Sequence, residues 1–69
     1  MSEPKVGDEV SWNTSQGATH GRVVDRRTKD FQLAGQRFTA DEDSPMFIVE
    51  SDKSGNRAAH RGDALTVRN

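Results

Sequence analysis

Alternation of apolar and polar residues with a period of two is the feature of this chain that most restricts its fold. Val6, Val10 and Trp12 share one parity, whereas Glu9 and Ser11 occupy the other. Successive side chains of a strand point to opposite faces, so this pattern predicts a strand with one buried face. Helical periodicity is poor throughout the chain. We therefore expect an all-β fold.

Several further segments of this kind follow at close spacing, at residues 22–26, 31–40, 46–51, 57–61 and 66–68. Residues 51–56 (SDKSGN) have the composition of a hairpin turn with a left-handed glycine. Residues 62–65 (GDAL) are expected to form one helical turn, with Asp63 capping free N–H groups. About five short strands separated by turns predict a small SH3-like barrel, because closing the sheet hides its edges.

Two positions in this pattern bear on where the strands turn and where they begin. The parity of the 31–40 segment changes across Ala34-Gly35-Gln36, which fits either a tight turn or a bulge in one strand. Pro45 lacks a backbone N–H and is expected at the start of the strand at residues 46–51, where that lack is tolerated.

The length of 69 residues allows one domain at most. We expect residues 1–5 to be a disordered N-terminus and residues 6–69 to form the domain. The first residues lack the apolar run of a signal peptide, no segment is long enough to span a bilayer, and there is no cysteine, which together predict a cytoplasmic protein without disulfides. The net charge of −1 gives no overall preference for nucleic acid or for acidic membranes.

An ordered set of residues carries a family resemblance: Gly7-Asp8-x-Val10-x-Trp12, Gly17-x-x-His20-Gly21-x-Val23, Gly35, Ala40, Asp43-x-Pro45, Val49, Ser51-Asp52-Lys53-Ser54-Gly55, Ala58-x-His60 and Leu65. This set resembles the hypervirulence-associated protein TUDOR domains over about residues 6–67. The resemblance implies a Tudor-like, SH3-like barrel, and it implies no particular chemistry. The chain departs from the family at Met46-Phe47, near which tyrosine is often found, and it contains no tyrosine at all.

The aromatic residues are few: Trp12, Phe31, Phe38 and Phe47. An aromatic cage that reads methylated lysine needs several of them around one cation. A barrel of this size needs the same rings for its core, because they bury the largest apolar area. We therefore expect Trp12, Phe38 and Phe47 in the core and no methyl-lysine cage.

The two histidines, His20 and His60, offer little for metal binding or catalysis. A structural zinc site usually has four ligands, and no cysteine is available to complete one. We expect each ring to be fixed by a hydrogen bond to a backbone carbonyl. No nucleophile–base arrangement is recognisable, so neither an enzyme nor a cofactor is predicted.

Basic residues fall into two groups. Arg22, Arg26, Arg27 and Lys29 follow the second predicted strand, and a C-terminal group comprises Arg57, Arg61 and Arg68. If the strands that carry them are neighbours, one face of the barrel is basic and can bind nucleic acid. The alternative is a solvated surface with cross-strand ion pairs, for example Asp25 or Glu50 opposite an arginine.

These observations predict a non-catalytic binding or scaffolding domain. Its partner is expected to be either nucleic acid on the arginine face or a protein or peptide in a groove beside the Trp12 loop, with no membrane partner. The alternative is a purely structural or self-associating domain, and we expect a monomer or a weak homodimer. The candidate ligand-binding residues are Trp12, His20, Arg22, Arg26, His60 and Arg61.

Overall fold

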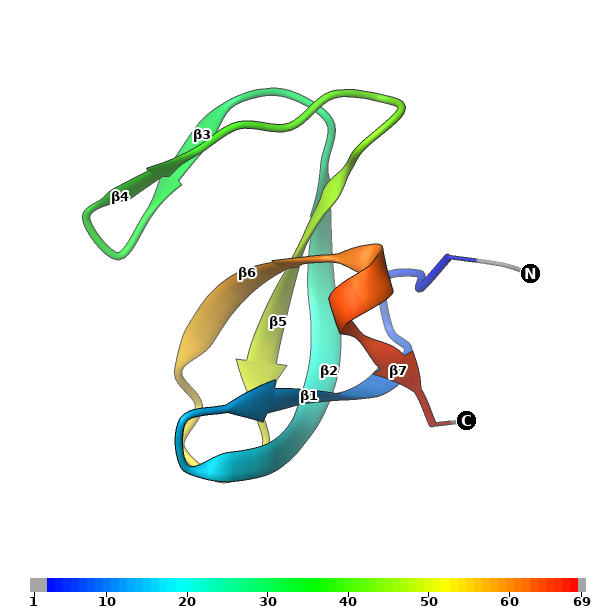
Figure 1. Cartoon of the computed structure of the whole chain (residues 1–69), viewed down its shortest axis with the longest axis vertical. Coiled ribbons are helices and arrows are strands. Elements are labelled where there is room, and N and C mark those ends of the chain that lie inside the picture. The colour runs from blue at the N-terminus through cyan, green and yellow to red at the C-terminus, as the bar shows by residue number, and fades with distance from the viewer. Residues whose placement is uncertain (1–2, 69) are drawn as a thin grey trace.

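The structure, a computed structural model that describes residues 3–68, is built almost entirely of strands (Figure 1). The elements are β1 (Glu9–Thr14), β2 (Gly17–Arg27), β3 (Phe31–Leu33), β4 (Gln36–Phe38), β5 (Met46–Ser51), β6 (Arg57–Arg61), the 3₁₀ turn η1 (Gly62–Ala64) and β7 (Thr66–Val67). Five strands form one antiparallel sheet in the order β6-β5-β2-β1-β7, and β3 and β4 form a separate hairpin. The predicted all-β, small barrel-like fold is confirmed.

The long strand β2 joins the two halves of the barrel. Its first part pairs with β1, from Thr14 opposite Gly17 to Glu9 opposite Arg22. Its second part pairs with β5, and the register shifts between Val23 and Asp25. An extra residue in one strand bends it, and β2 is visibly curved along its length (Figure 1). The predicted strand at residues 22–26 is therefore only the second part of a longer one, and His20 lies within it.

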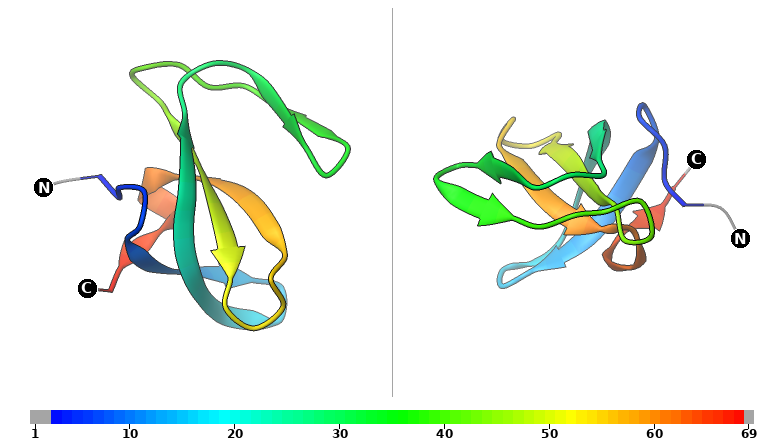
Figure 2. Two further views of the ribbon diagram at one scale, coloured as in Figure 1. Left: turned by 180° about the vertical axis from the view of Figure 1, so that it is seen from behind. Right: turned by 90° about the horizontal axis from the view of Figure 1, so that it is seen from above.

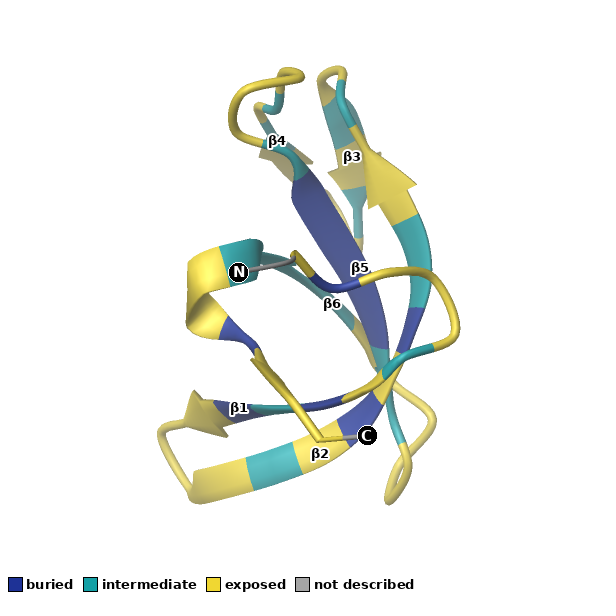
Figure 3. Cartoon of the chain, turned by 90° about the vertical axis from the view of Figure 1, so that its right-hand side faces the viewer, coloured by how far each residue is buried: buried dark blue, intermediate teal, exposed yellow. Residues whose placement is uncertain are grey.

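The core collects inward-facing strand residues, Val10, Trp12, Val23, Phe47 and Val49, together with Leu65, which follows η1. Buried positions follow β1, β2 and β5, while the hairpin loops are exposed (Figure 3). The prediction for Val10 and Trp12 is thus confirmed. The prediction for Val6 is wrong, because the chain turns at this point before β1 begins, and the side chain remains 60% exposed.

The separate hairpin resolves the question at Gly35. Ala34 and Gly35 both have positive φ, 52° and 78°, and they form the tight turn between β3 and β4. This turn places Phe31 directly opposite Phe38, and their rings stack with centroids 5.3 Å apart. The hairpin extends away from the main sheet (Figures 1 and 2). The prediction of Phe38 as a core residue is therefore wrong, because its ring packs on its hairpin partner.

The N-terminal segment from Glu3 onward is held against the barrel, with Pro4 close to Gly62 of η1. Pro4 is buried, and the Glu3 carboxylate lies 2.9 Å from Nε of Arg26, so contacts with the barrel begin within the segment expected to be disordered. Residues 1–2 of that segment lie outside the described residues. The predicted helical turn is present as η1. Its N-cap is Arg61 without a side-chain hydrogen bond, so the predicted capping role of Asp63, which lies inside the turn, is wrong.

Candidate functional site

The described residues form a hairpin groove and a terminal groove, which lie between different elements of the barrel. The hairpin groove, of about 480 Å³, lies between the β1–β2 and β5–β6 hairpins. The terminal groove, of about 1010 Å³, lies between the N-terminal segment, the loop before β5 and the η1–β7 segment. Both fall within or near the size range of small-molecule and peptide sites.

Hydrogen-bond donors and small polar groups dominate the lining of the hairpin groove. It consists of Trp12, Thr14–Thr19, Ser51, Lys53, Ser54, Asn56, Arg57 and Ala58. This part of the described chain contributes two cations and no carboxylate to the groove. The hairpin groove is therefore suited to a ligand that carries negative charge.

Local hydrogen bonds fix both hairpin turns that flank this groove. Thr14 Oγ1 accepts from the N–H of Gln16 at 3.1 Å and donates to the carbonyl of Gly17 at 2.9 Å. On the other side, Ser51 Oγ accepts from the N–H of Lys53 at 3.3 Å, and Ser54 Oγ accepts from the N–H of Asn56 at 3.2 Å. Short polar side chains that bond their own backbone stabilise such turns. The groove walls are thus shaped largely by sequence-local interactions.

Lys53 and Arg57 differ in how far their charge is already neutralised. Lys53 forms no ion pair with any residue in the described range 3–68. Arg57 Nε lies 3.3 Å from the carboxylate of Glu50, which is directly opposite on β5 and outside the groove lining. The carboxylate of Asp52 faces His20, with 3.7 Å to Nδ1. Lys53 is therefore the principal free cation of the hairpin groove.

Trp12 connects this groove to the core. Its side chain is only 6% exposed, and its ring centroid lies 5.7 Å from that of His60. Nε2 of His60 is buried and has no hydrogen-bond partner within the described residues, so the expected bond from this atom to a carbonyl is not formed. Burial lowers the pKa of His60 below its ordinary value, because an imidazolium would lose its hydration there.

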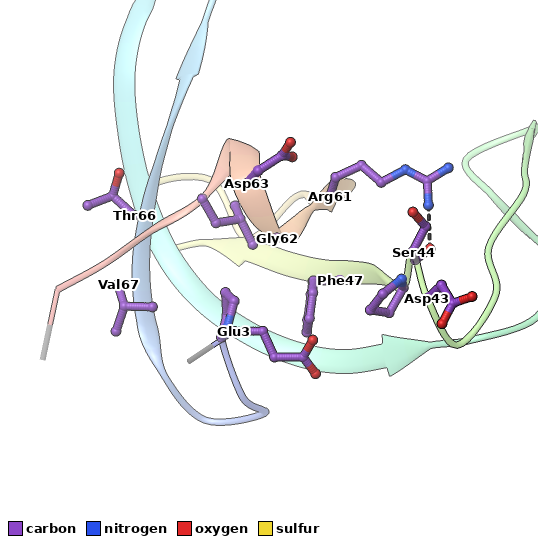
Figure 4. A pocket seen from close by; sticks show the side chains of 12 residues that line it. Glu3, Asp43, Ser44, Phe47, Arg61, Gly62, Asp63, Thr66 and Val67 are labelled. Carbon is purple, nitrogen blue, oxygen red and sulfur yellow. Dashed lines mark hydrogen bonds between the residues drawn. The ribbon is translucent and has the colours of Figure 1, made fainter. Parts of the chain in front are cut away.

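The terminal groove combines an apolar lining with carboxylates (Figure 4). Pro4, Pro45, Phe47, Leu65 and Val67 supply the apolar surface, and the carboxylates belong to Glu3, Asp43 and Asp63. The guanidinium of Arg61 donates to the carbonyl of Ser44 and, at 3.1 Å, to that of Thr39. Arg61 thereby anchors the loop that carries Asp43.

The candidate residues named from sequence do not form one site. Trp12 lines the hairpin groove and Arg61 the terminal groove, whereas His20, Arg22 and Arg26 line neither. His20 is paired with Ser11 on the outer face of the sheet, while His60 faces the core beside Trp12, so the two histidines are not brought together. Among residues 3–68, no group of three or more His, Asp or Glu side chains could hold a metal ion.

The predicted arginine face is broken up by the strand order. β5 lies between β2 and β6, so the strands that carry the two basic groups are not neighbours. Carboxylates lie beside several of the arginines: Arg26 with Glu3 at 2.9 Å, Arg27 with Asp25 at 3.0 Å and Arg57 with Glu50 at 3.3 Å. The alternative of cross-strand ion pairs is confirmed for Glu50, which lies opposite Arg57 on β6, whereas Asp25 pairs with Arg27 of its own strand.

Lys53, Asp43 and Asp63 were not identified as site residues from the sequence. Lys53 lies in the turn segment SDKSGN, and Asp43 lies in an acidic loop. The composition of both segments is explained by turn formation alone and does not indicate a binding site. The signal that could have identified Lys53 is a cation in a turn whose other residues are small and polar. The chain order alone does not show which loop lies opposite that turn.

A family comparison agrees with this architecture. The family model described as "Hypervirulence associated proteins TUDOR domain" matches residues 7–65, which is most of the chain. The chain belongs to this family. Comparisons with curated proteins and with solved structures gave no match. The matched TUDOR domain covers both hairpins of the hairpin groove, including the Ser51–Gly55 turn that carries part of the resemblance. Over residues 3–68, no helix has the length and apolar character needed to cross a membrane.

Proposed function

We propose that this TUDOR domain is a non-catalytic binding module that holds an acidic peptide segment in the hairpin groove. The observation that carries the proposal is the lining of that groove, in which the described side chains supply two cations and many donors but no carboxylate. A carboxylate placed there gains charge-assisted hydrogen bonds without facing a like charge. Lys53 supplies the free cation.

The burial of Trp12 and the carboxylates beside three of the arginines favour a peptide over nucleic acid as the ligand. Single-stranded nucleic acid is usually held by exposed rings on which bases stack, together with a track of cations along the backbone. Trp12 is buried, and Arg26, Arg27 and Arg57 each lie beside a carboxylate. An acidic peptide needs neither stacking rings nor a long basic track.

Three hydroxyl groups of the groove lining are engaged with the backbone, which supports a binding role over a catalytic one. Thr14, Ser51 and Ser54 use their oxygens in hydrogen bonds to nearby backbone groups. A nucleophilic hydroxyl needs a base within hydrogen-bond reach. Nε2 of His60, the buried ring nitrogen, has no hydrogen-bond partner among the described residues, these hydroxyls included.

The test is an NMR titration of the ¹⁵N-labelled protein with the capped acidic probe Gly-Pro-Glu-Val-Glu-Pro-Gly. We expect shifts of the amides at residues 14–19 and 51–58. Lys53→Gln is expected to weaken binding about threefold to fivefold, the range of one exposed charge contact. Lys29→Gln, which makes the same charge change in the β2–β3 loop outside the groove, is the matched control and should leave the affinity within twofold.

Two results would reject the proposal. One is the absence of shifts in both hairpins at millimolar probe concentration. The other is preferential binding of a single-stranded oligonucleotide of about twelve nucleotides. In that case, shifts would centre on Arg22, and affinity would fall steeply and linearly with the logarithm of salt concentration, because phosphate contacts release counterions.

A further inference from the structure

We infer that the terminal groove is a second binding surface, which takes an extended peptide segment of a partner protein with lysine or arginine side chains beside a small apolar residue. This surface is separate from the hairpin groove and opposite to it in charge. The inference does not depend on the function proposed for the hairpin groove.

The charge of the terminal groove is the first argument. Asp43 and Asp63 form no ion pair with any other residue of the described chain, and Glu3 shares its charge with Arg26. Asp43 lies in the loop before β5 and Asp63 in η1, and both line the groove together with Phe47 (Figure 4). Two free carboxylates that border a partly apolar groove are complementary to a segment that carries both cationic and apolar side chains.

Arg61, the one cation that residues 3–68 contribute to the groove lining, keeps its positive charge but forms no ion pair with Asp43 or Asp63. Its guanidinium donates to the carbonyls of Ser44 and Thr39 and is directed toward that loop (Figure 4). Arg61 is thus a positioning residue for the wall that carries Asp43. An incoming cation meets carboxylates, while the arginine is occupied by backbone oxygens.

The strand at the groove edge favours an extended ligand. Thr66 and Val67 line the groove and form β7, which is at one end of the five-stranded sheet and, within residues 3–68, pairs with β1 alone. Extended peptides commonly bind by adding to such an edge strand, where side chains fill adjacent pockets. Val67 is 39% exposed and offers an apolar contact for an apolar side chain of the ligand.

The test uses the capped basic probe Gly-Pro-Lys-Val-Lys-Pro-Gly, the charge-reversed counterpart of the acidic probe. We expect amide shifts at residues 43–47 and 62–67. The double variant Asp43→Asn with Asp63→Asn should weaken binding of the basic probe at least fivefold. Glu42→Gln, in the same loop but outside the groove lining, is the matched control and should change it less than twofold.

Three outcomes would overturn the inference. They are no shift in this groove at millimolar basic probe, equal affinity of the double variant and the wild type, or stronger binding of the acidic probe at the same amides. The amide spectrum of the free double variant should overlay that of the wild type away from the substituted loop and turn, which verifies that the fold is retained. The threefold to fivefold weakening of acidic-probe binding in Lys53→Gln, with basic-probe binding unchanged, distinguishes the two grooves, so that either proposal can fail without the other.

Discussion

The imidazole of His60 lies against the indole of Trp12, with the ring centroids 5.7 Å apart and the planes tilted by 41°. Trp12 is the only tryptophan in the chain and lines the hairpin groove. The contact therefore joins the core side of β6 to the floor of the candidate site. It also provides an intrinsic fluorescence probe of the protonation of His60.

The stability of the domain should depend on pH through His60. Burial lowers the pKa of His60 in the folded state, so the unfolded chain binds the proton more readily. The free energy of unfolding is expected to be highest above about pH 6.5 and to fall as the pH drops below that value, levelling off below the folded-state pKa. Urea unfolding between pH 7.5 and 5.5, followed by Trp12 fluorescence, measures this loss. It should largely disappear in His60→Gln and persist in His20→Gln, which changes a histidine on the outer face.

Substitution of Gly21 should be severely destabilising for a steric reason. A Cβ atom at this position would lie 1.9 Å from the backbone carbonyl oxygen of Glu50, at the place where β2 pairs with both β1 and β5. Gly21→Ala is expected to cost about 3 kcal/mol or more, because the strands must separate. Gly55→Ala meets no atom within 4 Å and should cost only about 1 kcal/mol, from its positive φ. Equal midpoints in urea unfolding would contradict this account.

Replacement of Phe47 should destabilise the whole domain, whereas replacement of Phe38 should destabilise only the β3–β4 hairpin. Phe47 is completely buried in the core, and Phe47→Ala is expected to cost about 3–5 kcal/mol, enough to unfold much of the population. Phe38→Ala removes only the stack with Phe31, about 1 kcal/mol, in the separate hairpin. Hydrogen exchange should therefore accelerate at residues 31–38 in Phe38→Ala while the β2 and β5 amides stay protected. Global unfolding of this variant would show that the hairpin belongs to the core.

Removal of the Arg61 guanidinium should loosen the acidic loop. Arg61→Gln loses the hydrogen bonds to the carbonyls of Thr39 and Ser44 and is expected to lower the free energy of unfolding by about 1 kcal/mol. Faster exchange of the Ser44 amide, which donates to Asp41, is the local readout. Arg68→Gln removes an exposed guanidinium near the C-terminus and serves as the control. Unchanged exchange in Arg61→Gln would contradict the positioning role.

Much of the fold could be predicted from local features of the sequence. The parity of Val10 and Trp12 predicted an inward-facing strand because side-chain direction in a strand depends only on neighbouring positions. The Ser51–Asn56 turn was predicted from residues that stabilise turns through their own side chains. The TUDOR family resemblance was likewise carried by residues whose order is visible in the chain. These features depend on short-range chemistry.

The candidate sites were less accessible from the sequence. Trp12 was named as a candidate residue and lines the hairpin groove, but the free cation Lys53 and the carboxylates Asp43 and Asp63 were not identified. Each groove is assembled from segments distant in sequence, and its charge depends on which side chains are already paired. Arg26, for example, is beside Glu3, a residue expected to lie in a disordered tail.

By itself, the sequence determined that the chain forms short strands, where the main turns lie, and that Val10, Trp12 and Phe47 enter the core. Only the tertiary structure decided that β5 separates β2 from β6, that Phe38 stacks on Phe31 outside the core, and that two grooves of opposite charge result. Alternation specifies which face of a strand is apolar. Alternation does not specify which strands are neighbours, because strand order is set by closure of the whole sheet around one small core.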